Sequence, residues 1–302
     1  MIPDRRSFLL QNIREKPFCD SGGRINLSIA GVRVDWITSS RPLQQSIREY
    51  FREYISDEGE PVAELCAEPF SESGFPSLWE DADPEFDIRE DSVVQRDFVA
   101  RWVASRRAVA LVAPGEDDAI HNLLRWFLPR ALLSKSAFLL HGAAVIRDGR
   151  GYVFFGQSGA GKSTTVSMIG ASDPESRVIG DDGVIVQMKR TGDGREVPWV
   201  FAAPLGCGYS REAPPAISAP ISGLFALAQD RMDAVESMSR TQGTAALLAS
   251  AMTVRMDESI DDRFDLARRF AESNCSIRRL RLKKSPEFWQ GLIMQRSCPV
   301  DI

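Results

Sequence analysis

Hydrophobic and polar positions alternate in two short runs near the start of the chain. The runs fill residues 25–37 on either side of Ala30-Gly31, which predicts a hairpin of two strands. Residues 42–55 instead place apolar side chains, such as Leu43 and Ile47, at the spacing of one helix face. An amphipathic helix is therefore expected to follow the hairpin.

A second alternating region comes after a long polar stretch. Residues 56–84 are acidic and rich in Pro, Gly and Ser, which predicts mostly loop. Alternation resumes over residues 86–112, with turn signals at Glu90-Asp91 and at 105–107, and predicts a small meander of strands. Residues 1–113 are therefore expected to form a smaller α+β domain, in which no motif indicates a chemical role.

Beyond this point the pattern changes to that of an α/β domain. Apolar residues keep helical spacing over residues 117–133, which predicts a long helix that opens the second domain. Two apolar strands, at 138–146 and 152–155, are joined by the turn signal Asp148-Gly149 and predict a hairpin. Because a hairpin pairs its strands antiparallel, the sheet of the domain at 114–302 is expected to be mixed.

The rest of the chain continues with both element types. A strand with a Pro near its start is expected over 217–227 and an Ala/Leu-rich helix over 241–252. The basic stretch 278–284 interleaves arginines and lysines with leucines, which predicts a closing strand with a solvated face rather than a binding patch. A short helix that begins near Glu287 is expected after it.

Composition and charge exclude several classes of protein. With 302 residues, 43% of them hydrophobic, the chain can bury a sizeable core in one large domain or two. The chain has a net charge of −5 and therefore lacks the positive potential that is typical of nucleic-acid binders, so no nucleic-acid partner is expected. The five cysteines are scattered without a CxxC pair, which supports neither a disulfide framework nor a zinc site. Free thiols fit a reducing compartment, and we expect a cytoplasmic protein.

Membrane segments are not expected either. Residues 1–18 carry basic side chains but no sustained apolar core, unlike a signal peptide. Every apolar run falls well short of the roughly 20 residues that a spanning helix needs. We therefore expect no membrane partner.

The strongest chemical signal is the stretch GQSGAGKST at residues 156–164, which satisfies the motif G-x-x-x-x-G-K-[ST]. An apolar strand precedes it and a helix can start within it. Glycines let backbone N–H groups approach phosphate oxygens, and the helix N-terminus adds its positive end. The alternative is a plain Gly/Ser turn before a helix. The residues expected to surround the phosphates are Gly156, Ser158, Gly159, Ala160, Gly161, Lys162, Ser163 and Thr164.

Two of these side chains have specific expected roles. Lys162 should neutralise the β- and γ-phosphates of a nucleotide, and the Ser163 hydroxyl should ligate Mg²⁺. The expected cofactors are therefore ATP and Mg²⁺. A GTPase is disfavoured because no N-K-x-D motif is present, and a transporter ATPase because no LSGGQ-like signature follows.

An acidic pair, Asp181-Asp182, follows one helix and a short connection after the motif. Such a pair can divide the work at a Mg²⁺–phosphate site, since one carboxylate can accept the proton of an attacking hydroxyl while the other binds the metal. Asp181 is the candidate base and Asp182 the candidate metal ligand. The alternative is an Asp-Gly hairpin turn without a catalytic role.

His141 lies on the strand before the motif strand. Counting outwards from the Asp148-Gly149 turn sets His141 opposite Gly156, within reach of the phosphates. The alternative is a core histidine with satisfied hydrogen bonds. His121, on the polar side of the preceding helix, is assigned no role.

Together these residues resemble the C-terminal kinase domain of HPr kinase/phosphorylase and its relatives in bacterial peptide-modification clusters. The resemblance spans residues 139–186 and rests on His141-Gly142, the hairpin, the glycine-rich motif and Asp181-Asp182, in that order. It implies an HPr kinase-like P-loop domain that phosphorylates a hydroxyl, usually of serine, with ATP. It further implies that Asp181 is the base, that His141 assists it, and that Lys162 and Ser163 hold phosphate and Mg²⁺. Members of this family often form oligomers, so a homo-oligomer is possible.

One part of the family pattern is missing. The family carries a Glu, a second metal ligand, ahead of a downstream glycine-rich run, whereas residues 198–208 contain no acidic side chain. Glu196 and Glu212 flank this region out of register, which argues against HPr as the substrate and against the reverse reaction. The loop from Gly206 to Arg211 is either a lid that carries Arg211 to the phosphate or an ordinary surface loop.

Two functions from different classes remain. The first is an ATP-dependent kinase that acts on a hydroxyl of a peptide, a protein or a small molecule, with Asp181, His141 and Lys162 as its catalytic residues. The second is an ATP-binding regulatory or assembly module with weak or no transfer activity, which the missing Glu favours. Covalent phosphate on an acceptor distinguishes the two.

Overall fold

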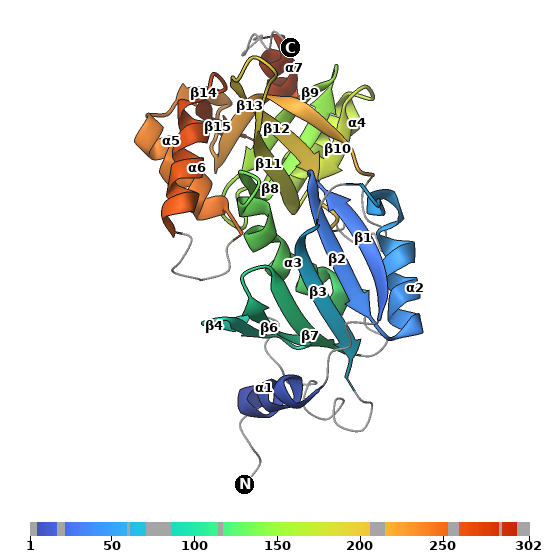
Figure 1. Ribbon diagram of the computed structural model, residues 1–302. Coiled ribbons are helices and arrows are strands. Elements are labelled where there is room, and N and C mark those ends of the chain that lie inside the picture. The colour runs from blue at the N-terminus through green and yellow to red at the C-terminus, as the bar shows by residue number, and fades with distance from the viewer. Residues whose placement is uncertain are drawn as a thin grey trace. The chain divides into compact units, whose positions relative to one another are not determined.

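The computed structural model describes residues 5–16, 22–58, 61–70, 86–113, 117–205, 215–252, 260–283 and 286–294 of the chain. These residues form two compact units, one up to Ala131 and the other from Leu132 onward. Each unit has its own mixed sheet, so the fold is α/β with mixed sheets (Figure 1). Within the described part, no helix is long and apolar enough to cross a membrane.

The first unit is built on a seven-stranded sheet with the strand order β1-β2-β3-β7-β6-β5-β4. Its strands are β1 (Gly23–Ile29), β2 (Val32–Thr38), β3 (Pro61–Pro69), β4 (Asp87–Arg89), β5 (Ser92–Val94), β6 (Phe98–Ala104) and β7 (Arg107–Val112). The turn at Ala30-Gly31 has positive φ at both residues, as a tight hairpin requires. The predicted hairpin and the meander at 86–112 are therefore both confirmed.

The helices of the first unit are α1 (Arg5–Glu15), α2 (Arg41–Tyr50), the 3-10 turn η1 (Arg52–Tyr54) and α3 (Asp117–Leu133). The Ser40 hydroxyl caps α2 by accepting from the Leu43 N–H, which fixes where that helix begins. Leu9 and Ile13 of α1 pack with Val99 and Leu111 of the sheet.

Strand β3 contradicts the prediction of a loop over 56–84. It is an interior strand that pairs parallel with both β2 and β7, and its apolar side chains Ala63, Leu65 and Ala67 are buried. Its two glutamates obscured this pattern. Glu68 is buried but accepts hydrogen bonds from the Ser39 N–H (2.6 Å) and hydroxyl (2.9 Å), which compensates for the loss of water.

Helix α3 belongs almost wholly to the first unit, although the sequence placed it at the start of the second domain. The ring of Phe127 stacks on that of Trp102 in β6, with centroids 4.9 Å apart, and the Arg130 guanidinium lies over the same Trp102 ring. These contacts tie the apolar face of the helix to the first sheet. The boundary between the units thus lies at residue 131 rather than at 113.

The second unit contains an eight-stranded sheet. Its strands are β8 (Ala137–Arg147), β9 (Arg150–Phe155), β10 (Arg177–Gly180), β11 (Gly183–Arg190), β12 (Glu196–Ala202), β13 (Ser218–Gln229), β14 (Ala234–Ser237) and β15 (Ile277–Leu282). β9 and β15 flank β13 in parallel, whereas the other pairings are antiparallel, so the predicted mixed sheet is confirmed. The long strands β8 and β13 each pair with several partners along their length.

The described residues of the second unit also form four helices, namely α4 (Lys162–Ser172), α5 (Arg240–Ser250), α6 (Ile260–Glu272) and α7 (Glu287–Met294). Leu247 of α5 and Phe270 of α6 join one core with the strands. Ile169 of α4 and Trp289 of α7 join a second core with Phe154 and Phe225. Helix α6 and strands β12 and β14 were not predicted from the sequence.

Candidate functional site

The glycine-rich stretch forms the connection between β9, which ends at Phe155, and α4, which begins at Lys162. Gly159 (φ 78°) and Gly161 (φ 99°) adopt left-handed backbone conformations, and the space where a Cβ would stand is open at both. Gly161 caps α4 without a side-chain hydrogen bond. The N–H groups of the first turn of α4 have no acceptor within the helix, so the loop offers donors and a positive helix end to an anion.

Lys162 is buried at the base of this loop, with 6% of its surface exposed. Its Nζ donates to the carbonyl oxygens of Gly156 (3.0 Å) and Gln157 (2.9 Å), which holds the side chain across the loop. Burial lowers the pKa of Lys162, while the negative charge of Asp182 acts in the opposite direction. The loop therefore contains a cation that lacks much of the solvation an exposed lysine has.

The acidic pair lies between β10 and β11, and its conformation is not a hairpin turn. Both strands run antiparallel to β8 in succession, with Gly180 opposite Ala144 and Gly183 opposite His141. β10 and β11 thus pair one after the other along β8, and Asp181 and Asp182 are the two residues between them that make no ladder pairs. The hairpin alternative is wrong for this reason, since the chain does not reverse direction here.

Close packing explains the glycine that precedes the pair. A Cβ at Gly180 would stand 2.6 Å from the Gly183 oxygen and 2.7 Å from a Val184 methyl group, so no larger residue fits without a backbone shift. A hydrogen bond connects the acidic pair to α4, because the Ser163 hydroxyl donates to the Asp181 carbonyl oxygen at 3.0 Å. Helix α4 and the acidic pair are therefore in direct contact.

His141 also reaches the acidic pair. Its Nδ1 lies 3.6 Å from Asp182 Oδ1. On the other side of β8, Gly142 pairs with Phe155, which sets His141 next to the start of the glycine-rich loop, as counted from the sequence. The structure thus brings the start of α4, with Lys162 and Ser163, to the acidic pair between β10 and β11, beside His141 in the middle of β8. Ser158, Ala160 and Thr164 belong to the loop and the first turn of α4.

The residues present fit a nucleotide with Mg²⁺. The Ser163 hydroxyl and the Asp182 carboxylate are oxygen ligands of the kind Mg²⁺ takes, and the metal usually completes its shell with phosphate oxygens and water. Among the described residues, no group of three or more His, Cys, Asp or Glu side chains could hold a metal on its own.

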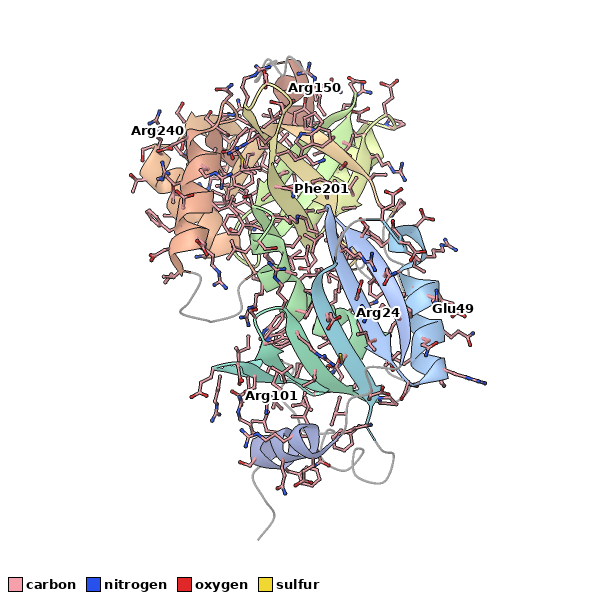
Figure 2. All side chains as sticks on the ribbon, in the orientation of Figure 1. Arg24, Glu49, Arg101, Arg150, Phe201 and Arg240 are labelled. Atoms are coloured by element: carbon pink, nitrogen blue, oxygen red, sulfur yellow. The ribbon has the colours of Figure 1, made fainter. Side chains whose placement is uncertain are left out.

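Of the two glutamates that flank residues 198–208, Glu196 lies away from the site and Glu212 lies outside the described residues. Glu196 begins β12 opposite Arg190, at the far end of the strand from Ala202, which pairs with Val184 beside the acidic pair. It is held there by an ion pair with Arg269. Figure 2 labels Phe201, near the site end of this strand. Glu212 and the expected Gly206–Arg211 lid lie outside the described residues.

Gln229, at the end of β13, was not predicted from the sequence as a site residue. Its Nε2 donates to the Gly159 carbonyl oxygen at 2.6 Å, so it contacts the loop directly. No local motif marks this residue, because the contact depends on the parallel pairing of β9 with β13, which are distant in the chain. His121 lies in the first unit, where its ring contacts that of Tyr50 at a centroid distance of 3.8 Å.

Comparison with solved structures finds a weak likeness to the Hpr(Ser) kinase/phosphatase from Coxiella burnetii. The two are 10% identical, and the match covers 52% of this chain and 93% of that chain with a TM-score of 0.26. A TM-score this low supports no conclusion about the present protein. No curated protein matches the sequence.

A family match covers the site and most of the second unit. The family is described as SynChlorMet cassette protein ScmC, and its match extends over residues 120–282, from α3 to the end of β15. This is more than half of the 302 residues. The chain therefore belongs to the family of SynChlorMet cassette protein ScmC.

Proposed function

We propose that this protein is an ATP-dependent kinase that transfers a phosphoryl group to a hydroxyl, serine in particular, of a peptide, a protein or a small molecule. One observation carries the proposal: a helix N-terminus that follows a glycine-rich loop and begins with a buried lysine is hydrogen-bonded to the backbone of an acidic pair, and a histidine lies beside that pair. The resemblance of residues 139–186 to HPr kinase/phosphorylase supports the same reaction. We assign the activity to the second unit, from Leu132 onward, as a P-loop kinase domain.

Each residue has a separate part in binding. ATP would supply the phosphoryl group, and Mg²⁺ would shield the charge of its oxygens. The N–H groups of the loop and the Lys162 ammonium would bind the phosphates. To reach them, Lys162 would exchange the carbonyl oxygens of Gly156 and Gln157 for phosphate oxygens. Ser163 and Asp182 would hold the metal.

Asp181 is the proposed base. It would take the proton of the acceptor hydroxyl as that oxygen bonds to phosphorus and ADP leaves. The attacking oxygen would then not have to carry a positive charge. The hydrogen bond from Ser163 to the Asp181 carbonyl would fix this residue relative to the phosphates. His141, 3.6 Å from the Asp182 carboxylate, would orient the metal ligand and is a positioning residue.

The proposal is tested by transfer from γ-labelled ATP with Mg²⁺. The acceptors are an extract of the source cells, separated into peptide, protein and metabolite fractions. We expect label in one fraction with the wild type and none with Lys162→Ala, which loses the phosphate-binding cation. Asp181→Asn should bind ATP as the wild type does and lose transfer, because only the proton acceptor is removed. Full transfer by Asp181→Asn would show that another group is the base.

A second candidate, an ATP-binding regulatory or assembly module, has one observation in its favour. The only acidic side chain of β12, Glu196, lies at the end away from the site and is paired with Arg269. The strand therefore supplies no second metal ligand there. If ATP binds and no fraction is labelled, this module is the better description of the protein.

A further inference from the structure

The side of the glycine-rich loop away from His141 is built from the carboxyl ends of two parallel strands. β9 and β13 are in register, with Phe155 beside Ala226, so the next residue, Leu227, flanks Gly156. A Cβ at Gly156 would stand 3.4 Å from the Leu227 oxygen. Gln229 then reaches back to the Gly159 carbonyl oxygen. The loop is therefore held between β8 on one side and β13 on the other.

The residues after Gln229 form a turn that β15 holds at both ends. The Asp230 N–H donates to the Leu282 oxygen (2.9 Å), and the Asp230 carboxylate accepts from Arg281 (3.0 Å). At the other end, the Asp233 carboxylate accepts from the Lys283 N–H (3.0 Å). Figure 1 shows β13 and β15 side by side where this turn begins. The turn is thus fixed next to the loop.

Two side chains of this turn are exposed, and one of them is apolar. Met232 has 70% of its surface exposed, the largest value among the exposed apolar residues of the described part of the chain. Arg231 is exposed beside it. A thioether side chain packs well on a flat ring, and a guanidinium stacks on one. A fixed turn that presents both side chains offers a surface to the face of a heteroaromatic ring.

The direction of a bound nucleotide follows from the two flanks of the loop. Ser163 contacts the acidic pair, which is on the β8 side, so the terminal phosphate belongs there. The nucleoside then leaves the loop on the opposite side, towards Gln229 and the turn. We propose that Met232, with Arg231, binds the base of the nucleotide, and that the acceptor hydroxyl enters from the β8 side. This inference rests on the proposed function.

The test compares two ligands that share the phosphates and differ in the base. ATP and inorganic tripolyphosphate, each with Mg²⁺, are titrated calorimetrically into the full chain. Met232→Ala should weaken ATP binding about tenfold, since covering an apolar side chain of this size is favourable by about that factor. Met232→Leu should retain most of the affinity. Neither change alters charge, so tripolyphosphate should bind equally to all three proteins.

A matched control is Val235→Ala, which shortens another exposed apolar side chain on the neighbouring strand β14 and should change neither affinity. Unchanged ATP binding by Met232→Ala would overturn the inference, and so would an equal loss for both ligands. Failure of the wild type to bind either ligand would overturn both the inference and the proposed function. In a further outcome, the wild type binds ATP and Met232→Ala weakens this binding as expected, while no phosphoryl group is transferred to any acceptor. That result would contradict the proposed kinase activity but would support the proposed binding of the base by Met232.

Discussion

Lys162 shows at the scale of one residue how the site is prepared for an anion. Its ammonium is buried and bonded to two loop carbonyls, and burial lowers its pKa against the opposing influence of Asp182. Bound phosphates would supply the negative charge that burial makes necessary, so they would favour the charged form. Bound phosphates would therefore offset a further part of the cost of burying the lysine.

This arrangement predicts a pH dependence of nucleotide binding. Because the pKa of Lys162 lies below the ordinary lysine value, ATP affinity should fall with rising pH earlier than an exposed lysine would allow. Fluorescence titrations between about pH 7 and about pH 10 would measure this fall. Lys162→Arg should bind more weakly at neutral pH but lose no further affinity over this range, because a guanidinium stays charged. A parallel fall in both proteins would assign the effect to another group.

The sequence predicted that several residues come together at the candidate site, but not their full surroundings. Motif spacing located Lys162 and Ser163, and counting from a hairpin turn placed His141, because both depend only on local geometry. The same local reasoning took Asp181-Asp182 for a possible hairpin, which the pairing of β10 and β11 with β8 contradicts. Gln229 could not be found this way, since its contact with Gly159 requires the register of a parallel pair.

At the scale of elements, strand β3 shows how a local pattern can fail to predict a strand. β3 was missed because Glu64 and Glu68 break its apolar pattern, yet both are compensated across the sheet: Arg107 lies 3.9 Å from Glu64, and Ser39 donates to Glu68. Hairpins such as β1–β2 and β8–β9 were found because a two-residue turn fixes their register. Pairings that are parallel leave no such local signal.

The close packing around Gly180, just before the acidic pair, leads to a prediction for the substitution Gly180→Ala. Gly180→Ala would press a Cβ against the Gly183 backbone, so the segment that carries the acidic pair must shift. We expect a loss of about 1–3 kcal/mol in the free energy of unfolding. Phosphoryl transfer should decrease more than ATP affinity, since the carboxylates move while the loop remains. Denaturant unfolding and the labelled-ATP assay measure the two effects.

A control for this change lies at the other end of β11. Gly192 follows that strand, has no positive φ, and a Cβ there would meet nothing within 4 Å. Gly192→Ala should therefore leave transfer unchanged and stability unchanged or slightly higher. If Gly180→Ala behaves in the same way, the close approach to Gly183 does not determine the position of the acidic pair.

At the scale of the whole molecule, the chain carries two sheets with separate cores. The core of the first unit includes Leu9, Val99 and Leu111, and those of the second gather around Phe270 and Trp289. The candidate site, including its base-binding turn, is built from residues of the second unit alone. The family match lies mostly in the same unit. Phosphate binding should therefore stabilise one unit directly and not the other.

Calorimetry of the full chain can test this separation. We expect two unfolding transitions, of which ATP with Mg²⁺ raises only one, because a ligand stabilises the state that binds it. At a ligand concentration about 100 times Kd the gain is about 2.7 kcal/mol, which corresponds to a rise of about 5–10 °C for a unit of this size. Lys162→Ala should show both transitions without the rise. A single transition that moves as a whole with ATP would mean that the two units unfold cooperatively, and that the first unit depends on the nucleotide bound by the second.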